Sequence, residues 1–227
     1  MGLKLLTAPA AGPVSLATAK AQARIDYVQA EQDLWLSGTV IPGCTGRVEE
    51  YLGRRLMKQQ WLLTLDGFPP FPFAWPAPVQ GTTLPRRIDR AILLPYAGPL
   101  FYVAALPGPP VVPANLEVKY VDAAGALQTL DPAEYQVRTS EEPAELVPAY
   151  GKAWPGTRNQ KDAVEVRYWA GYATAEEVPA AIREAIAIFC ATQAANREAA
   201  VTGTISTELP LSAQWLLDPY RIVRFAA

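Results

Sequence analysis

The sequence predicts an α+β fold: a helical core, an antiparallel β subdomain inserted into it, and an extended C-terminal arm. Apolar side chains recur at helical spacing in residues 15–52 and 180–200. Between these ranges the chain consists of short, strand-like apolar runs separated by proline and glycine clusters. The chain ends in an unusually apolar segment that follows Thr202-Gly203. With 227 residues, half of them hydrophobic, it has ample length to bury a core.

Two helices are expected at the start of the helical core. Ser15 is a suitable N-cap for a helix over residues 16–25. A second helix is predicted over residues 29–52, with Gly53 as its C-cap. Helix-breaking residues inside this span predict a break or a bend near residues 37–43. Its inner side should carry Leu34, Val40 or Ile41, Val48, Tyr51 and Leu52.

The middle of the chain has the signals of a small antiparallel β unit. A strand is expected at residues 60–65, followed by a loop over 68–85 that contains too many prolines for a ladder. A strand at 88–94 precedes a second proline- and glycine-rich stretch over 95–113. The remaining strands are predicted as a hairpin of 116–121 with 126–130, two short strands at 135–137 and 145–147, and a half-buried strand at 164–169.

The longest regular helix is expected near the end of the core. Thr174 and Glu177 fit a capping box, and Pro179 fits the first helical turn. The helix should run over residues 180–200. Its core stripe is predicted to comprise Ile182, Ile186, Phe189, Cys190 and Gln193.

The C-terminal arm, residues 204–227, is too apolar to be a solvated tail. Contiguous exposed apolar surface usually marks an interaction site, and termini are ordered mainly when something holds them. The arm is therefore expected either to pack on its own domain or to dock onto a neighbouring subunit. Leu211 and Trp215 have the spacing of one short helix that Pro219 would end.

Composition excludes several classes of function. The chain has no histidine, and Cys44 and Cys190 lie far apart in sequence in two predicted helices, so no metal or cofactor is expected and the cysteines are interpreted as small buried hydrophobes. The net charge is −2 and the 20 basic residues are scattered, which argues against nucleic-acid binding as the primary function. No apolar run reaches the ~18 residues of a membrane helix, so a soluble cytosolic protein is expected.

Several segments together resemble one known family. They are the helix end Val48-Glu-Glu-Tyr-Leu-Gly-Arg-Arg-Leu56, the strand Trp61-Leu-Leu-Thr-Leu-Asp-Gly-Phe-Pro69, Asn196-Arg-Glu198 in the long helix, and the arm from Glu208 to Arg221. In this order the chain resembles the head–tail connector (adaptor, head-completion) proteins of long-tailed phages and gene transfer agents, in the subgroup with a β insertion in the helical core. The resemblance covers nearly the whole chain. The corresponding parts are residues 1–57 and 173–201 for the helical core, 58–172 for the inserted β subdomain and 202–227 for the docking arm.

The resemblance implies a structural, non-enzymatic role without cofactors. Members form a ring, usually of twelve subunits, below the portal of the filled capsid, in the virion neck; they are made in the host bacterial cytoplasm. The ring extends the DNA channel without sequence-specific binding and provides the platform for the next tail-proximal neck or stopper protein. In relatives the C-terminal arm reaches into the portal. By this resemblance the portal-docking residues are expected to be Leu209, Leu211, Trp215, Leu216, Leu217, Tyr220 and Ile222.

Two other classes of function remain open from the residues alone. A hydrolase built on carboxylate pairs would use Glu141 with Glu142, or Asp131 with Glu134. A carbohydrate- or peptide-binding β module would use Phe71, Phe73 and Trp75 in the proline-rich loop. Neither needs the ring stoichiometry that an adaptor needs, so the mass of the assembled protein distinguishes them.

Overall fold

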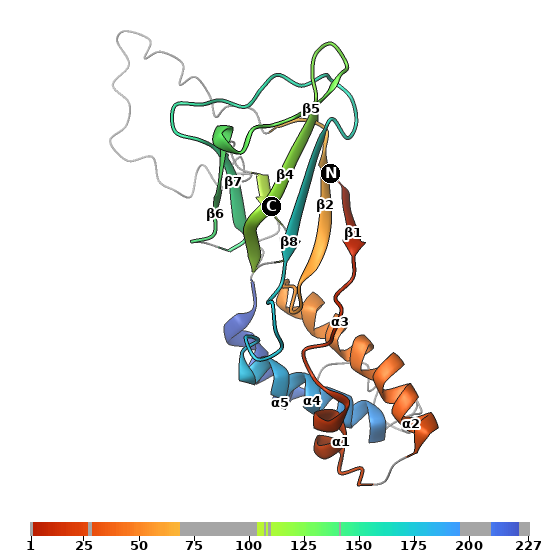
Figure 1. The fold of residues 1–227 in the computed structure, drawn as a ribbon. Coiled ribbons are helices and arrows are strands. Elements are labelled where there is room, and N and C mark those ends of the chain that lie inside the picture. The colour runs from red at the N-terminus through yellow and green to blue at the C-terminus, as the bar shows by residue number, and fades with distance from the viewer. Residues whose placement is uncertain are drawn as a thin grey trace, which may run out of the picture.

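The computed structural model describes residues 2–26, 29–68, 104–106, 108, 110–140, 142–195 and 210–222. Within these ranges the chain has two parts stacked along its long axis, a β part and a helical part (Figure 1). Each part has its own hydrophobic cluster of buried side chains. The predicted α+β class is confirmed, with helices and antiparallel sheets both present.

The N-terminal helices agree with the prediction in position, but the second one does not have all of the predicted residues on its inner side. Helix α1 spans Leu16–Ala23, and the Ser15 hydroxyl accepts a hydrogen bond from the Thr18 N–H as an N-cap should. The predicted bend is a π-helical segment, Leu36–Val40, which joins α2 (Ala30–Trp35) to α3 (Ile41–Leu52) without a break in the helix. Gly53 ends α3 with φ +68°.

One residue of the predicted inner side is misplaced. Leu34 is 72% exposed, whereas Val40, Ile41, Val48 and Leu52 are buried. A π turn contains an extra residue, so it rotates the residues before it relative to those after it. The prediction extended one helical period across the whole span and therefore put Leu34 on the wrong face.

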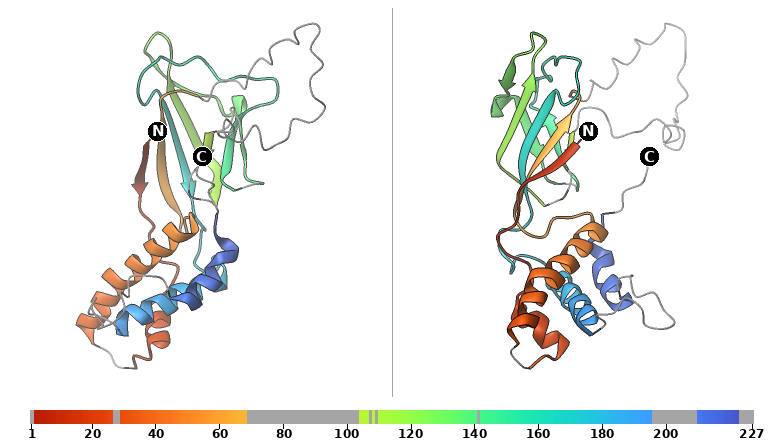
Figure 2. Two further views of the ribbon diagram at one scale, coloured as in Figure 1. Left: turned by 180° about the vertical axis from the view of Figure 1, so that it is seen from behind. Right: turned by 90° about the vertical axis from the view of Figure 1, so that its right-hand side faces the viewer.

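The other two described helices complete the helical part. Helix α4 (Ala180–Ala195) lies in the middle, and α1, α3 and α5 (Leu211–Leu217) all contact it. The predicted stripe Ile182, Ile186, Phe189 and Cys190 is buried, while Gln193 is half-buried. Figure 2 shows α3 and α5 on opposite sides of α4. The predicted capping box is wrong: the Glu177 carboxylate accepts a hydrogen bond from the Ala173 N–H, in a turn that precedes the helix.

The β part consists of two antiparallel sheets. The larger has the strand order β1-β2-β8-β4-β5, and the smaller has the order β3-β7-β6. Their bounds are β1 Gly2–Thr7, β2 Gln59–Leu65, β3 Ala104–Leu106, β4 Val111–Val121, β5 Leu127–Thr129, β6 Tyr135–Arg138, β7 Ala144–Pro148 and β8 Val164–Ala170. Strands β2 and β5 to β8 match predicted strands closely, and the second half of β4 matches the strand predicted at 116–121.

One hydrophobic cluster joins the inner faces of both sheets. In β8 buried and half-buried residues alternate strictly, so that Val164, Val166 and Tyr168 point inward. Leu106 and Leu146 of the smaller sheet belong to the same cluster. The outward face of β8 and β4 carries a group of charged residues: Glu117 contacts both Lys119 and Arg167, and Arg167 also contacts Glu165.

Two parts of the β prediction are corrected. Strand β1 was not predicted, because residues 1–57 were assigned to the helical part; it pairs antiparallel with β2 at the edge of the larger sheet. No strand was predicted in the proline- and glycine-rich stretch 95–113, yet it contains β3 and the start of β4. Pro113 is tolerated because it lies where the pairing of β4 with β8 is interrupted, between Val112 and Glu117. The loop over 68–85, beyond Phe68, and the strand at 88–94 lie outside the described residues.

The two parts are joined by a closely packed junction. Met57 and Tyr172 form a parallel bridge, the Lys58 N–H donates to the Tyr172 carbonyl at 2.9 Å, and the Tyr172 N–H donates to the Leu56 carbonyl at 3.2 Å. Gly171 has φ +100°, and a Cβ there would lie 2.1 Å from the Met57 carbonyl oxygen. Only glycine fits this position.

Candidate docking site

The described part of the C-terminal arm is a short helix with two different faces. Pro210 precedes α5, and a 3₁₀ turn over Asp218–Tyr220 follows it. Ala213 and Leu217 are fully buried in the helical cluster, and α5 packs along α4. On the other face Leu211 is 68% exposed and Trp215 is 73% exposed. The two exposed side chains are four residues apart and therefore form one ridge on the helix surface.

The structure thus divides the predicted docking residues into three groups. Leu211 and Trp215 are exposed, whereas Leu217 is part of the chain's own core. Leu216 and Tyr220 pack partly against that core, and Ile222 is half-buried. Leu209 lies outside the described residues. The sequence left self-packing and docking as alternatives, but this helix has one face suited to each.

The end of the arm is held by the last turn of α3. The Tyr51 hydroxyl donates to Asp218 Oδ1 at 2.5 Å, which raises the pKa of Tyr51. The guanidinium of Arg221 lies 4.8 Å from the centre of the Tyr51 ring. The Ile222 N–H donates to the Leu52 carbonyl at 2.9 Å. These contacts fix the direction of α5 and hence of its exposed ridge.

Arg54 connects the arm to the β part. Its Nε donates to the Tyr220 carbonyl at 2.6 Å, and its two terminal nitrogens donate to the two carboxylate oxygens of Glu142, one of them at 2.6 Å. Glu142 lies in the turn between β6 and β7. A bidentate guanidinium–carboxylate pair combines charge with a fixed geometry. One side chain therefore links three segments that are distant in sequence.

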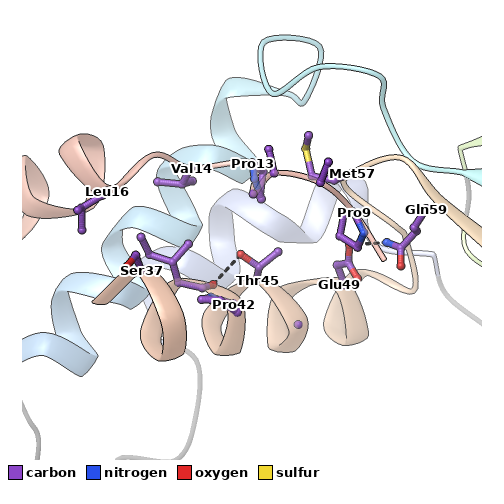
Figure 3. A pocket seen from close by; sticks show the side chains of 15 residues that line it. Pro9, Pro13, Val14, Leu16, Ser37, Pro42, Thr45, Glu49, Met57 and Gln59 are labelled. Atoms are coloured by element: carbon purple, nitrogen blue, oxygen red, sulfur yellow. Dashed lines mark hydrogen bonds between the residues drawn. The ribbon is translucent and has the colours of Figure 1, made fainter. Parts of the chain in front are cut away.

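An apolar groove lies on the other side of the helical part, between α3 and the segment 9–14 that leads into α1 (Figure 3). It has a volume of about 410 Å³. Thr45, Glu49 and Gln59, which line it, already have hydrogen-bond partners within the chain. Thr45 donates to the Ile41 carbonyl at 2.8 Å, and one carboxylate oxygen of Glu49 accepts from the Leu56 N–H at 2.7 Å and from Gln59 at 3.3 Å. Such a surface suits packing rather than catalysis.

The residues considered for a hydrolase have structural partners. Asp131 caps the 3₁₀ turn Pro132–Glu134 by accepting from the Ala133 N–H at 2.9 Å. Glu134 pairs with Lys152 at 2.8 Å, a contact that raises the pKa of Lys152. Glu142 is held by Arg54, and Glu141 lies outside the described residues. None of these three carboxylates lines the groove beside α3, the groove next to Arg221 and Ile222, or the one beside Trp35.

The residues considered for a β module cannot be placed. Phe71, Phe73 and Trp75 lie outside the described residues. Phe68, at the start of the same loop, stacks on Trp154 with a ring-centroid distance of 4.6 Å. In the described ranges no three Cys, Asp or Glu side chains are grouped to hold a metal ion. No described helix has the length and apolar composition needed to cross a membrane.

Solved structures give the decisive comparison. The chain matches a chain in the neck of an empty GTA particle computed with C6 symmetry, with a TM-score of 0.70 and 18% identity. It shares the fold of chains from gene transfer agent particles. A chain in the virion of a native gene transfer agent matches with a TM-score of 0.69 and 17% identity, and one in the neck of a native GTA particle computed with C12 symmetry matches with 0.60 and 18%. Each match covers 100% of this chain and 98% of the other.

The similarity is one of fold over the full length, with little identity in sequence. No model of a protein family matches the sequence, and no curated protein matches it either. The full coverage includes both the helical and the β part, so the two parts occur together in the matched chains. This agrees with the resemblance found in the sequence.

Proposed function

We propose that the protein is a structural head–tail adaptor of a phage or phage-like particle. Twelve copies form a ring in the neck below the portal, which extends the DNA channel and provides the platform for the next tail-proximal neck or stopper protein. DNA passes through the lumen without sequence-specific binding, and the protein has no enzymatic activity or cofactor. It is made in the host bacterial cytoplasm and does not enter a membrane.

One observation carries this proposal: the full-length fold similarity to chains from GTA particles, two of them from the neck. Those neck structures were computed with C6 and C12 symmetry, which is consistent with a closed ring. The described residues also favour a structural role, because Glu49 in the apolar groove and the carboxylates Asp131, Glu134 and Glu142 already have partners.

We assign portal docking to the arm, with Leu211 and Trp215 as the residues that contact the portal. Both are large, apolar and exposed, and they form one ridge on α5. Large aromatic side chains in buried pockets often cost ~2 kcal/mol or more of binding free energy when truncated. Leu217 and Tyr220 would then act indirectly, by holding α5 on the helical part.

Within the ring, neighbouring subunits would contact each other through the helical part, with the β part projecting outward. Exposed residues lie on α3, at Pro42, Arg47 and Glu50, and on α5, at Leu211 and Trp215. These two helices lie on opposite sides of α4 (Figure 2). A head-to-tail contact between two different surfaces closes into a ring when it rotates each subunit, relative to the one before, by a full turn divided by a whole number.

Mass measurement of the full-length protein with its portal tests the proposal. The wild type should bind as a ring of twelve, and Trp215→Ala should reduce portal binding at least tenfold. Ser212→Ala, on an exposed residue of the same helix, is the matched control and should bind as the wild type does. A protein that stays monomeric on the portal, or a Trp215→Ala variant that binds normally, would contradict the ring and the docking assignment respectively.

A further inference from the structure

Strand β1 is held on its own subunit by its pairing with β2 and by little else. The pairing is antiparallel and extends over Gly2–Thr7. All six residues of the strand are exposed, and neither hydrophobic cluster contains a residue that precedes Val14. Leu3, Leu5 and Leu6 are 40%, 41% and 41% exposed. The backbone of β1 therefore holds it in the sheet, while its side chains add nothing to the core.

The connection between β1 and the helical part is exposed as well. Residues 8–12 belong to no helix or strand, and the first buried residues of the described chain are Pro13 and Val14. Figure 1 shows this connection as one extended stretch between β1, at the edge of the larger sheet, and α1. Pro9 and Pro13 favour extended backbone in the residue before each of them. Residues 2–12 can span at most about 40 Å from Pro13, so β1 can reach a subunit packed alongside.

The proposed ring needs a contact between neighbouring subunits that the described helices supply only in part. None of the large apolar side chains of α3 is exposed, and Arg47 and Glu50 are among its exposed residues. The exposed ridge on α5 is assigned to the portal. Exposed charged pairs add little binding free energy. Exchange of an identical element between subunits adds contacts without a new complementary surface, and so it provides what these helices lack.

We propose that neighbouring subunits in the ring exchange β1, so that residues 2–7 of each chain pair with β2 of the next chain. The proposal rests on the ring of the proposed function. The structure fixes the occupant of the β2 edge, because a copy of residues 2–7 already fits there within the single chain. Exchange replaces this pairing by an identical one, and neither hydrophobic cluster has to open. Once the helical parts lie side by side, the neighbour's β2 is present at a high effective concentration.

Cross-linking of paired cysteines tests the exchange in the full-length protein. Lys4 and Leu62 lie opposite each other in β1 and β2, so Lys4→Cys with Leu62→Cys places two thiols within reach of a short bis-maleimide. The variant is assembled on its portal, treated, denatured and analysed by gel electrophoresis and peptide mapping. Mapping separates this link from any made by the buried Cys44 and Cys190. We expect the 4–62 link to join different chains in the ring, giving covalent multimers up to the size of the ring. In the unassembled monomer the same link should lie within one chain.

Thr64→Cys with Glu165→Cys is the matched control, because these residues lie opposite each other in β2 and β8, inside the sheet. It should give links within one chain, in the ring as in the monomer. Lys4→Cys alone should give no multimers.

Three results would overturn the exchange. One is a 4–62 link that stays within one chain in the assembled ring. The others are dimers of Lys4→Cys alone, which would mean that two β1 strands pair with each other, and a link from Lys4→Cys to the portal. In each case a ring of twelve leaves the adaptor proposal standing, since the mass of the ring is measured separately. A protein that forms no ring contradicts the adaptor proposal, and the exchange with it.

Discussion

At the scale of single residues, neighbours on one short helix have opposite roles. Trp215 is 73% exposed, while Leu217, two residues later, is fully buried against α4. Both belong to the docking set that the resemblance implies, because in the sequence they differ little: both are apolar and lie in the arm. Burial separates the residue that can reach a partner from the residue that holds the helix in place.

Truncating these two side chains should therefore affect stability very differently. Leu217→Ala leaves a cavity in the helical core and should lower the free energy of unfolding by about 2–5 kcal/mol. Trp215→Ala removes an exposed side chain and should change it by no more than about 0.5 kcal/mol. Urea unfolding followed by circular dichroism measures both. Equal losses would mean that the ridge is part of the chain's own core.

Two glycines give a second matched pair. Gly171→Ala places a Cβ 2.1 Å from the Met57 carbonyl oxygen at φ +100°, so it should cost about 3 kcal/mol or more. Gly43→Ala occupies open space in α3 and should stabilise the protein by about 0.5–1 kcal/mol. Thermal melting of the two variants shows the signs directly. A stable Gly171→Ala variant would mean that the junction can shift to make room.

At the scale of elements, local signals predicted some features well and others not at all. Ser15, Gly53 and the strict alternation of β8 depend on neighbouring residues, and the structure has them as expected. Strand β1 depends instead on its pairing with β2, more than 50 residues away, and its own residues are all exposed. No local pattern distinguishes such a strand from an irregular terminus.

The candidate site was predictable only in its composition. The apolar arm, and the helix that contains Leu211 and Trp215, could be expected from the sequence. Which face is buried depends on α4, and the direction of the arm depends on Tyr51 and Arg54. These contacts join residues more than 160 positions apart, and neither side chain has a local feature that indicates its partner.

Amide hydrogen exchange should show how the irregular helix behaves. We expect the amides of residues 36–46 to exchange at least tenfold faster than those of 47–52, because the π turn, Pro42 and the glycines weaken the first range. The regular part of α4, residues 182–190, is the internal reference for a protected helix. Uniform protection from 36 to 52 would contradict this local weakening of the helix.

At the scale of the whole molecule, two separate hydrophobic clusters are joined by a few contacts. The helical and β clusters share no residue. The bridge between Met57 and Tyr172 joins the parts along the backbone. Arg54 joins them through its side chain, with hydrogen bonds to Tyr220 and Glu142. Cooperative unfolding of the molecule should therefore be sensitive to Arg54.

We predict that the wild type unfolds in one calorimetric transition and that Arg54→Ala divides it. The substitution removes the charge-assisted hydrogen bonds and leaves the Tyr220 carbonyl without this donor, at a cost of about 2–3 kcal/mol. Since the lost contacts link the two parts, the calorimetric enthalpy should exceed the van't Hoff enthalpy in the variant but not in the wild type.

Lys152→Ala is the control for this experiment. It removes an exposed ion pair with Glu134 inside the β part, where only a small loss of stability is expected and the single transition should remain. If Arg54→Ala also unfolds in one transition, the backbone bridge alone couples the two clusters. The contact from the arm to the β6–β7 turn would then stabilise the arm without coupling the unfolding of the helical part to that of the β part.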